Sequence, residues 1–496
     1  MIPARNLWLP RRLQQRASSK RHMCWRLWRP ARVACFRGFS QSGPLAGVRV
    51  LDMTRVLAGP SCTQVLGDMG AEVTKIERPD TGDDTRGFAP PFLPGAEKDK
   101  KPMAAYFAAQ NRNKLSVTLN YTKPEGQEVL RRLLKSCDVL VENFKTGTLD
   151  KYGLGYADLK AAYPSLVYCS ITGFGQTGPY SPRPGYDALV QAMGGFMSVT
   201  GETDGEPMKV GVPIHDLYAG LHGVIGILAA LRHASLTGEG QHVDIGMLDV
   251  STSMLANQAS NYLSTGQLPQ RLGNQHPNIV PYQVMPAADG YFILAVGNDP
   301  TFERFVGVAD KADPSASAPK LLEDSRFNSQ TARVDNRKLV TDTCNAITRK
   351  QTVEWWLREL EGASIGCSPI KNLEEVFEDP QVKAREMVIE MPVSGHSPAK
   401  FVASPLKFST TPVSYRRPPP SLGEHTEDKA FVLQLPYFES ASRNRGKLRM
   451  SLPKLASVKR RSRTSGGRVS FDRSSCRLLE EPFWRVQLGC AKERRA

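Results

Sequence analysis

Asp216 is the residue whose type and setting in this sequence best suit covalent chemistry. It is followed by apolar residues at helical spacing, so we predict that it stands at a helix N-terminus. The apolar positions are Leu217, Leu221, Val224, Ile225, Leu228 and Leu231. An Asp at that place is often only the N-cap, which is worth ~1 kcal/mol. The alternative is functional: the helix end keeps the carboxylate ionised, and the carboxylate attacks an acyl carbonyl. His215 is not expected to form a dyad with Asp216, because adjacent side chains diverge at a helix start.

A second pattern, GFGQTG at 173–178, fits the dinucleotide fingerprint G-x-G-x-x-G and follows a predicted strand. The fingerprint needs a helix directly after it, because the pyrophosphate lies at the helix N-terminus. Here Pro179, Pro182 and Pro184 follow within six residues and predict a rigid loop instead. The loop disfavours NAD or FAD binding, and the sequence contains no GxxxxGK[ST] loop, so an NTPase is not indicated either.

The net charge of +16 is distributed unevenly along the 496 residues. Residues 1–42 carry ten Lys or Arg and no acid, and residues 441–496 carry sixteen against four acids, which leaves 43–440 at −6. A mildly acidic body argues against a nucleic-acid-binding core. The nine cysteines include no CxxC pair and have no His cluster beside them, so neither a disulfide framework nor a metal site is indicated.

The two ends differ from the body in composition. Residues 1–42 are rich in Arg and free of acids, which is typical of a mitochondrial transit peptide cleaved near 39–42 and predicts a mitochondrial matrix protein. Residues 431–496 are basic and rich in Arg and Ser, which predicts a disordered tail. We expect no membrane span, because no apolar run reaches the ~20 residues required. The most apolar stretch, 217–231, is expected to be a buried helix.

The body begins with alternating strand and helix patterns. Strands are predicted at 48–53, 72–77, 138–141 and 166–171, with a helix from Pro60 to Gly70 and another opened by a capping box, TKPE at 122–125. Repeated βα units predict an α/β fold with a parallel, Rossmann-like sheet. We predict a large domain from 43–270 that carries the nucleophile, a smaller α+β domain at 271–370 with a helix around Trp355, and a return to the large domain at 371–430.

Short strings along the body make the chain resemble the class III CoA-transferases, the family of formyl-CoA and carnitine CoA-transferases. The resemblance runs from Pro44 to about Thr426. It rests on LAGVRVLD at 45–52, AGP at 58–60, GAEV at 70–73, KIERP at 75–79, NRNK at 111–114, VENF at 141–144, GFG at 173–175, GYD at 185–187, TGEGQ at 237–241 and GEHT at 423–426. Each string is common, but their order is specific.

The resemblance implies that Asp216 is the nucleophile, acting through an aspartyl anhydride and then an aspartyl-CoA thioester, with backbone amides of glycine loops holding the oxyanion. It implies no tightly bound cofactor and no metal, with CoA thioesters as substrates. By position, it implies CoA contacts at Arg55, Ala58, Arg78, Asn143, Phe144, Lys151 and Tyr152. The family fold is a pair of interlocked, ring-like monomers, so a homodimer is expected.

Three features depart from the family pattern. Leu57 replaces a glutamine of formyl-CoA transferase, so formate and oxalate need not be substrates. The glycine-rich active-site loop is represented only by LGNQHP at 272–277. Beyond Thr426 the usual terminal helix is expected to be missing, and the sequence from Asp428 resembles an alternative splice product.

Within the family, the transit peptide and core are most similar to the mitochondrial members that transfer CoA from succinyl-CoA to glutarate or hydroxymethylglutarate. The partners are then an acyl-CoA and a dicarboxylate. One alternative is a 2-methylacyl-CoA racemase, which shares the GYD signature but needs a His some thirty residues before Asp187; Lys160 occupies that place. The other is an inactive splice form whose basic tail binds acidic partners.

Overall fold

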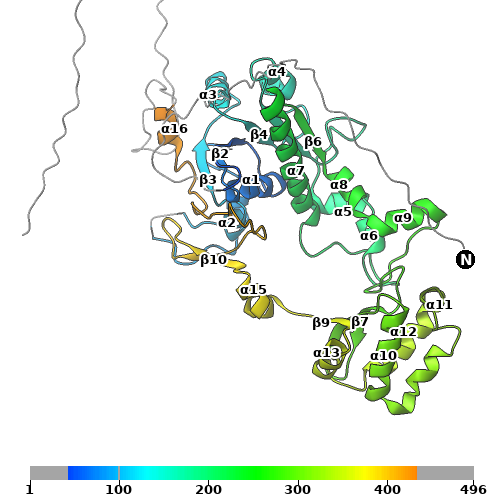
Figure 1. Cartoon of the computed structure of the whole chain (residues 1–496). Coiled ribbons are helices and arrows are strands. Elements are labelled where there is room, and N and C mark those ends of the chain that lie inside the picture. Colours follow the sequence, from blue (N-terminus) through cyan, green and yellow to red (C-terminus); the bar gives the residue numbers. More distant parts are fainter. Residues whose placement is uncertain (1–42, 99–100, 433–496) are drawn as a thin grey trace, which may run out of the picture. The chain divides into compact units, whose positions relative to one another are not determined.

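A six-stranded parallel sheet is the centre of the computed structural model, which describes residues 43–98 and 101–432 (Figure 1). The strand order is β3-β2-β1-β4-β5-β6. The strands are β1 (Arg49–Asp52), β2 (Glu72–Glu77), β3 (Lys114–Thr118), β4 (Val139–Glu142), β5 (Val167–Thr172) and β6 (His242–Gly246). This is the order of a doubly wound sheet, whose direction of winding reverses between β1 and β4. The predicted α/β, Rossmann-like fold is therefore confirmed.

Helices cover both faces of this sheet. On one face, α1 (Ala58–Asp68) and α7 (Ile214–Thr237) pack on alternate residues of β1, β4 and β5. On the other face, α3 (Pro124–Leu134) and α4 (Tyr156–Lys160) share one hydrophobic core with buried residues of the chain segment that connects these two helices. The remaining helices of this part are η1 (Asp84–Gly87), α2 (Ala105–Ala109), η2 (Asp150–Tyr152), α5 (Asp187–Met193), α6 (Phe196–Val199), α8 (Met247–Met254) and α9 (Ala256–Thr265).

Two local expectations are wrong. The capping box before α3 does not form: Lys123 is the N-cap without a side-chain bond, and the Thr122 hydroxyl donates to Asn120 instead (2.7 Å). The long apolar helix is buried on one side only, because Leu221 and Ile225 of α7 are 46% and 63% exposed. By length and composition α7 also meets the criterion for a membrane span, although it packs on α1 and the sheet.

Residues 280–367 enclose a hydrophobic core of their own around Trp356, whose ring stacks near Phe292. A three-stranded antiparallel sheet, β7 (Tyr282–Pro286), β8 (Tyr291–Ala295) and β9 (Gly366–Pro369), forms one side of this core. Its helices are α10 (Asp299–Ala312), η3 (Pro314–Ala316), η4 (Ala318–Leu322), α11 (Gln330–Asp335), α12 (Arg337–Thr348) and α13 (Val353–Gly362). The predicted helix around Trp355 is α13.

The chain after residue 370 returns to the first part and packs on it. Phe401 lies in one core cluster with Phe107, and Arg112 donates to the Val402 carbonyl (2.8 Å). The elements here are α14 (Leu373–Glu378), α15 (Pro380–Ala384), β10 (Val388–Met391), β11 (Ala399–Val402) and α16 (Thr426–Val432). A short helix, α16, begins at Thr426, and Lys429 pairs with Glu72 (2.7 Å). The absence of the family's usual terminal helix stays a prediction, because the residues after 432 lie outside the described part of the chain.

The exact domain boundaries at 271, 371 and 431 stay predictions. The transit peptide at 1–42 and the tail from 433 onward lie outside the described residues.

Candidate active site

Asp216 lies in the first turn of α7 and is half-buried. It is not the cap, because Pro213 holds the N-cap position and makes no side-chain bond to the helix. Burial, and after it the neighbouring carboxylate of Asp187, raises the pKa of Asp216 to about 7. Desolvation and the like charge of Asp187 thus act against the ionised form, which the helix end was expected to favour.

Asp187, the first residue of α5, caps α7 from outside the helix. Its Oδ1 accepts the main-chain N–H groups of His215 (2.8 Å) and Asp216 (3.3 Å). Its Oδ2 accepts the side-chain amide of Gln191 (2.5 Å), and Gln191 in turn accepts the N–H of Val210 (2.8 Å). Both oxygens of Asp187 are thus engaged in fixing the backbone that carries Asp216.

His215 points away from Asp216, as predicted for adjacent residues. Its ring is fully buried and meets the Phe196 ring edge to face at 4.5 Å. Burial lowers the pKa of His215, so the imidazole is neutral near pH 7. Neither ring nitrogen has a hydrogen-bond partner among the described residues, so His215 forms no hydrogen-bonded dyad with Asp216. Its Nδ1 lies 3.9 Å from Oδ1 of Asp187.

The N-terminus of α1 lies beside α7. A Cβ on Gly220 would come within 2.7 Å of the Ala58 carbonyl and 2.2 Å of the Ser61 hydroxyl, so the two helices touch there. Asp216 is one turn earlier on the same face of α7, which directs it toward the loop before α1. In that loop Val56 has a φ of +67°, a costly conformation for a β-branched residue and one that occurs mainly where function requires it.

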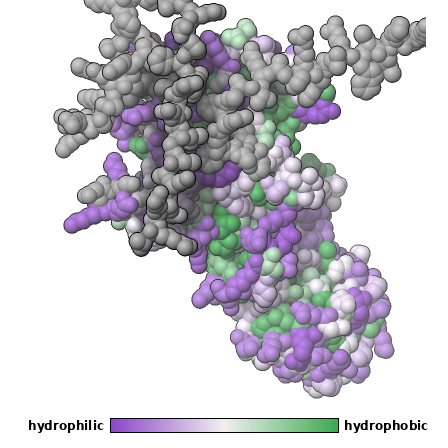
Figure 2. Space-filling model, turned by 60° about the vertical axis from the view of Figure 1, so that its left-hand side comes forward, coloured by the Kyte–Doolittle hydropathy of each residue, from purple (hydrophilic) through white to green (hydrophobic). Residues whose placement is uncertain are grey.

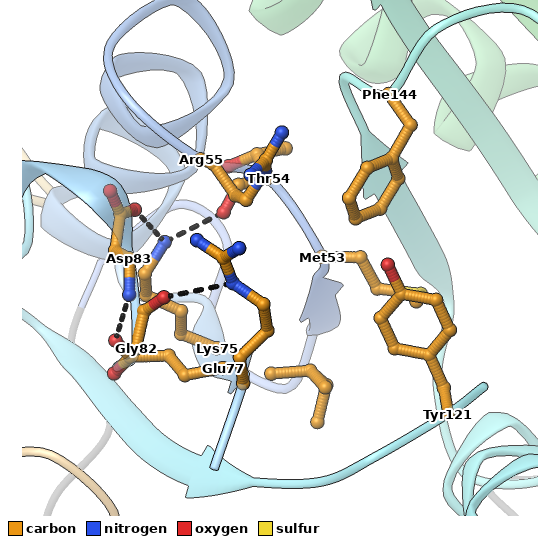
Figure 3. Close-up of a pocket in the computed structure, with 11 residues that line it drawn as sticks. Met53, Thr54, Arg55, Lys75, Glu77, Gly82, Asp83, Tyr121 and Phe144 are labelled. Carbon is orange, nitrogen blue, oxygen red and sulfur yellow. Dashed lines mark hydrogen bonds and ion pairs between the residues drawn. The ribbon is translucent and has the colours of Figure 1, made fainter. Parts of the chain in front are cut away.

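A cavity of about 180 Å³ opens at the carboxyl ends of β1, β2 and β4 (Figure 3). Three of the predicted CoA contacts line it, namely Arg55, Arg78 and Phe144. The position is the one that a doubly wound sheet favours for ligands, outside the strand ends where the winding reverses. Figure 3 shows aromatic rings of Tyr121 and Phe144 on one side and charged groups on the other.

The two arginines share one carboxylate. Arg55 pairs with Asp84 at 2.8 Å and Arg78 pairs with the other oxygen of Asp84 at 2.5 Å. All three side chains are partly exposed, and the Arg55 guanidinium also lies 5.5 Å from the Phe144 ring centre. Asp84 therefore holds both guanidinium groups at the cavity, where an anionic phosphate could replace it.

The other predicted contacts are placed around this cavity in different ways. Asn143 uses its whole amide on Arg55, accepting its N–H (2.8 Å) and donating to its carbonyl (2.7 Å). The Tyr152 ring packs at 5.8 Å from Tyr121 and so lies behind the aromatic wall. Lys151 is exposed and forms no ion pair with a described residue. Ala58 is buried at the start of α1 and can offer only backbone atoms.

Buried ion pairs support the floor of the cavity. Lys75 is fully buried, pairs with Asp83 (2.8 Å) and donates to the Thr54 carbonyl (2.8 Å). Asp83 also accepts the N–H of the strained Val56 (3.2 Å). A buried cation therefore holds both ends of the loop that carries Arg55, and losing it would leave an unpaired buried charge.

Several residues of the site were not predicted from the sequence. Asp187 was noted only as part of the GYD string shared by the CoA-transferases and the racemases, and Tyr121, Asp84 and Lys75 were not assigned a role. Tyr106 of α2 was also missed: burial raises the pKa of its hydroxyl, and so do the charges of Asp216 and Asp187, which places it within electrostatic reach of both. Only Lys75 had a sequence signal, as a lysine inside a strand pattern that reads as buried.

No group of three or more His, Cys, Asp or Glu within 43–98 and 101–432 is arranged to hold a metal ion. The geometry instead combines a half-buried carboxylate at a helix start with a cavity bearing two arginines. Such a site belongs to an enzyme that handles an anionic, phosphate-bearing ligand and has a carboxylate available for covalent chemistry.

Comparison with known proteins agrees with that class. The sequence pattern described as CoA-transferase family III matches residues 45–426. Succinate–glutarate CoA-transferase of Agrobacterium fabrum is 46% identical over 386 residues, which are 77% of this chain and 94% of that protein. Succinyl-CoA:glutarate CoA-transferase of Homo sapiens is 39% identical over 383 residues, covering 77% of this chain and 84% of that protein.

A solved structure gives the same result. The crystal structure of a CAIB/BAIF family protein from Brucella suis superposes with a TM-score of 0.69 at 44% identity, covering 79% of this chain and all of that one. This chain belongs to CoA-transferase family III, and it is a CoA-transferase.

Proposed function

We propose that this enzyme transfers CoA from succinyl-CoA to a C5 dicarboxylate such as glutarate or hydroxymethylglutarate, with Asp216 as the nucleophile. The observation that carries the proposal is the placement of Asp216, half-buried and uncommitted to capping, beside the α1 N-terminus. The choice of substrates follows the relatives of Agrobacterium fabrum and Homo sapiens named above.

The proposed reaction runs in two exchanges. The Asp216 carboxylate attacks the thioester carbonyl of succinyl-CoA, which forms a mixed anhydride and releases CoA thiolate. The thiolate attacks the aspartyl carbonyl, which frees succinate and leaves an aspartyl-CoA thioester. The acceptor carboxylate then attacks this thioester, and the released thiolate attacks the acyl carbonyl of the new anhydride, which regenerates Asp216.

Backbone amides at the start of α1 are suited to the tetrahedral intermediates. The α1 N-terminus carries no side-chain cap, so the main-chain N–H groups of Ala58 and Gly59 are available to a developing oxyanion. Pro60 has no N–H, and the Ser61 N–H donates to the Leu57 carbonyl (2.8 Å). The Asp83 carboxylate and the Asn143 amide hold the preceding loop rigid through Val56 and Arg55. Such preorganised donors favour the transition state over the substrate.

CoA itself is proposed to occupy the 180 Å³ cavity. Its phosphates would displace Asp84 from Arg55 and Arg78, and the adenine would stack near Phe144 and Tyr121. The exposed Lys151 would add positive charge at the rim.

A racemase is disfavoured by the same geometry. Both oxygens of Asp187 accept hydrogen bonds from α7 and Gln191, which leaves it poorly placed as a free base. Lys160, at the position where a racemase has its second base, lies on the exposed side of α4 over the Tyr156 ring.

The enzyme is further proposed to be a homodimer of the mitochondrial matrix. Large apolar side chains of α7, α9 and their flanks are solvent-exposed in one copy of the chain, and a second copy would cover them. They include Leu221, Ile225, Leu236, Tyr262, Leu263 and Leu268. Figure 2 likewise shows hydrophobic surface between hydrophilic regions on the face in view. The matrix location rests on the composition of residues 1–42.

The test is transfer of CoA from succinyl-CoA to isotope-labelled glutarate without ATP. Wild-type enzyme should form labelled glutaryl-CoA, and Asp216→Asn should fold but lose turnover by at least about a thousandfold. Incubation with succinyl-CoA and hydroxylamine should convert Asp216 to a hydroxamate detectable by peptide mass spectrometry. A hydroxamate on Asp187, or full activity in Asp216→Asn, would show that the nucleophile is wrong. Exchange of an α-proton without CoA transfer would support the racemase.

A further inference from the structure

A second cavity, of about 210 Å³, lies next to the one assigned to CoA and has a buried polar floor. Glu142, Ser170 and His242 belong to this floor, and exposed residues such as Lys145 and Asp150 stand at its rim. The proposed reaction uses none of these groups. Their arrangement therefore calls for a separate explanation.

The three floor residues form a hydrogen-bonded row. The Ser170 hydroxyl lies 2.9 Å from Nε2 of His242 and also bonds the Glu142 carboxyl. Ser170 lies between Glu142 and His242, so Glu142 does not orient the imidazole toward the serine. The three residues are therefore not a Ser–His–acid nucleophile. The rings of Tyr156 and Tyr168 hold His242 in place at 5.0 and 5.4 Å.

Glu142 connects this row to the CoA cavity. Its side chain is 6% exposed, and its Oε2 accepts the main-chain N–H of Phe144 (2.8 Å). The intervening Asn143 grips the Arg55 backbone, and the Phe144 ring lines the CoA cavity. Three successive residues at the end of β4 thus face the second cavity, the Arg55 loop and the first cavity in turn.

We propose that Glu142 is a positioning residue for CoA binding, which acts by holding the Phe144 N–H and is itself braced by Ser170 and His242. This inference rests on the proposal that CoA occupies the first cavity. Burying a carboxyl group costs free energy unless hydrogen bonds within the protein replace those it made to water. Here they fix the direction of the Phe144 ring and of the Asn143 amide together.

Two substitutions separate the hydrogen bond of Glu142 from its charge. Glu142→Met keeps the length and bulk of the side chain but offers the Phe144 N–H no oxygen. Glu142→Gln keeps the reach and supplies a carbonyl oxygen to that N–H, while its NH₂ donates to Ser170, whose hydroxyl can turn toward His242. Glu128→Gln on the exposed surface of α3 is the control, because among the described residues Glu128 pairs with the exposed Arg132.

The readouts are the Kd of free CoA by calorimetry, and the KM for succinyl-CoA against kcat. Glu142→Met should raise Kd and KM about tenfold with kcat within about twofold, whereas Glu142→Gln and Glu128→Gln should stay within about threefold of wild type. Equal effects of the Met and Gln variants would overturn the positioning role. A fall in kcat at unchanged KM would also overturn it, by placing Glu142 in the chemistry.

If the proposal that CoA occupies the first cavity is wrong, the wild-type enzyme will bind no CoA through Arg55 and Phe144. That result differs from a change of affinity confined to the Glu142 variants. Circular dichroism melts establish whether each variant folds. If Glu142→Met does not fold, Ser170→Ala removes the hydroxyl that braces Glu142 and contacts His242. It should raise the Kd of CoA by about two- to fivefold, and an unchanged Kd in that variant would contradict the inference.

Discussion

The main-chain N–H of Asp216 donates to the carboxylate of Asp187 at 3.3 Å, so the residue that fixes the start of α7 also places a negative charge beside the proposed nucleophile. Asp187 therefore influences both the position and the pKa of Asp216. Burial contributes more to the raised pKa than this charge does.

The pH profile of CoA transfer should reflect this relationship. Because the proposed attacking group is the ionised carboxylate of Asp216, whose pKa is raised to about 7, kcat/KM should be constant above that pH and fall about tenfold per unit below it. Asp187→Asn removes the like charge but keeps an oxygen for the N–H groups of His215 and Asp216. Its midpoint should move to lower pH, as read from kcat/KM between pH 5 and 9. An unmoved midpoint would mean that Asp187 does not influence the titrating group.

Asp216→Asn should be at least as stable as the wild type at pH 8. The folded-state pKa of Asp216 is above the unfolded value of about 3.9, so ionising it costs the folded state as pH rises from about 4 to 7. After allowance for partial exposure, removing that cost should add about 1–2 kcal/mol to the free energy of unfolding at pH 8. The gain should vanish at pH 4. Urea unfolding at both pH values measures it, and a loss of stability would argue for a structural role.

Breaking the buried ion pair between Lys75 and Asp83, beside the proposed CoA cavity, should strongly destabilise the folded protein. Lys75→Met leaves Asp83 with an uncompensated buried charge and should lower the free energy of unfolding by about 3–5 kcal/mol. The control is Lys338→Met, which breaks an exposed pair with Asp342 and should cost no more than about 0.5 kcal/mol. Similar effects of the two variants in urea titrations would contradict the assigned role of Lys75.

The contact between α1 and α7 should tolerate no added methyl group. In Gly220→Ala the new Cβ meets the Ala58 carbonyl, so the start of α1 must shift away from Asp216, at a cost of about 1–3 kcal/mol. We expect kcat to fall more than tenfold while KM for succinyl-CoA changes little. Gly307→Ala is the matched control, because that glycine lies inside α10 with no atom within 4 Å of an added Cβ, and Ala favours a helix.

A charge on the exposed face of α7 should prevent self-association. Ile225→Glu places a carboxylate where a second copy is expected to pack, so light scattering after size exclusion should report a monomer for the variant and a dimer for the wild type. Tyr291→Glu, at an equally exposed apolar position of β8, should leave the mass unchanged. A monomeric wild type would remove the homodimer from the proposal.

The sequence by itself determined the α/β alternation, the family and the place of Asp216 in a first helical turn. These depend on short-range patterns: β-branched runs at 72–77 and 166–171, and apolar residues at helical spacing after Asp216. The predicted strands and the long helix followed because local propensity and burial agree there.

The tertiary structure alone decided what surrounds these elements. Asp187 caps α7 across 29 residues of sequence, Asp84 joins Arg55 to Arg78, and Asn143 reaches 88 residues back to Arg55. The failed capping box at Thr122 shows the same limit, because a competing bond to Asn120 won. Hydrogen bonds and desolvation depend on which groups the chain packing brings within about 3 Å, and sequence periodicity carries no record of such distances.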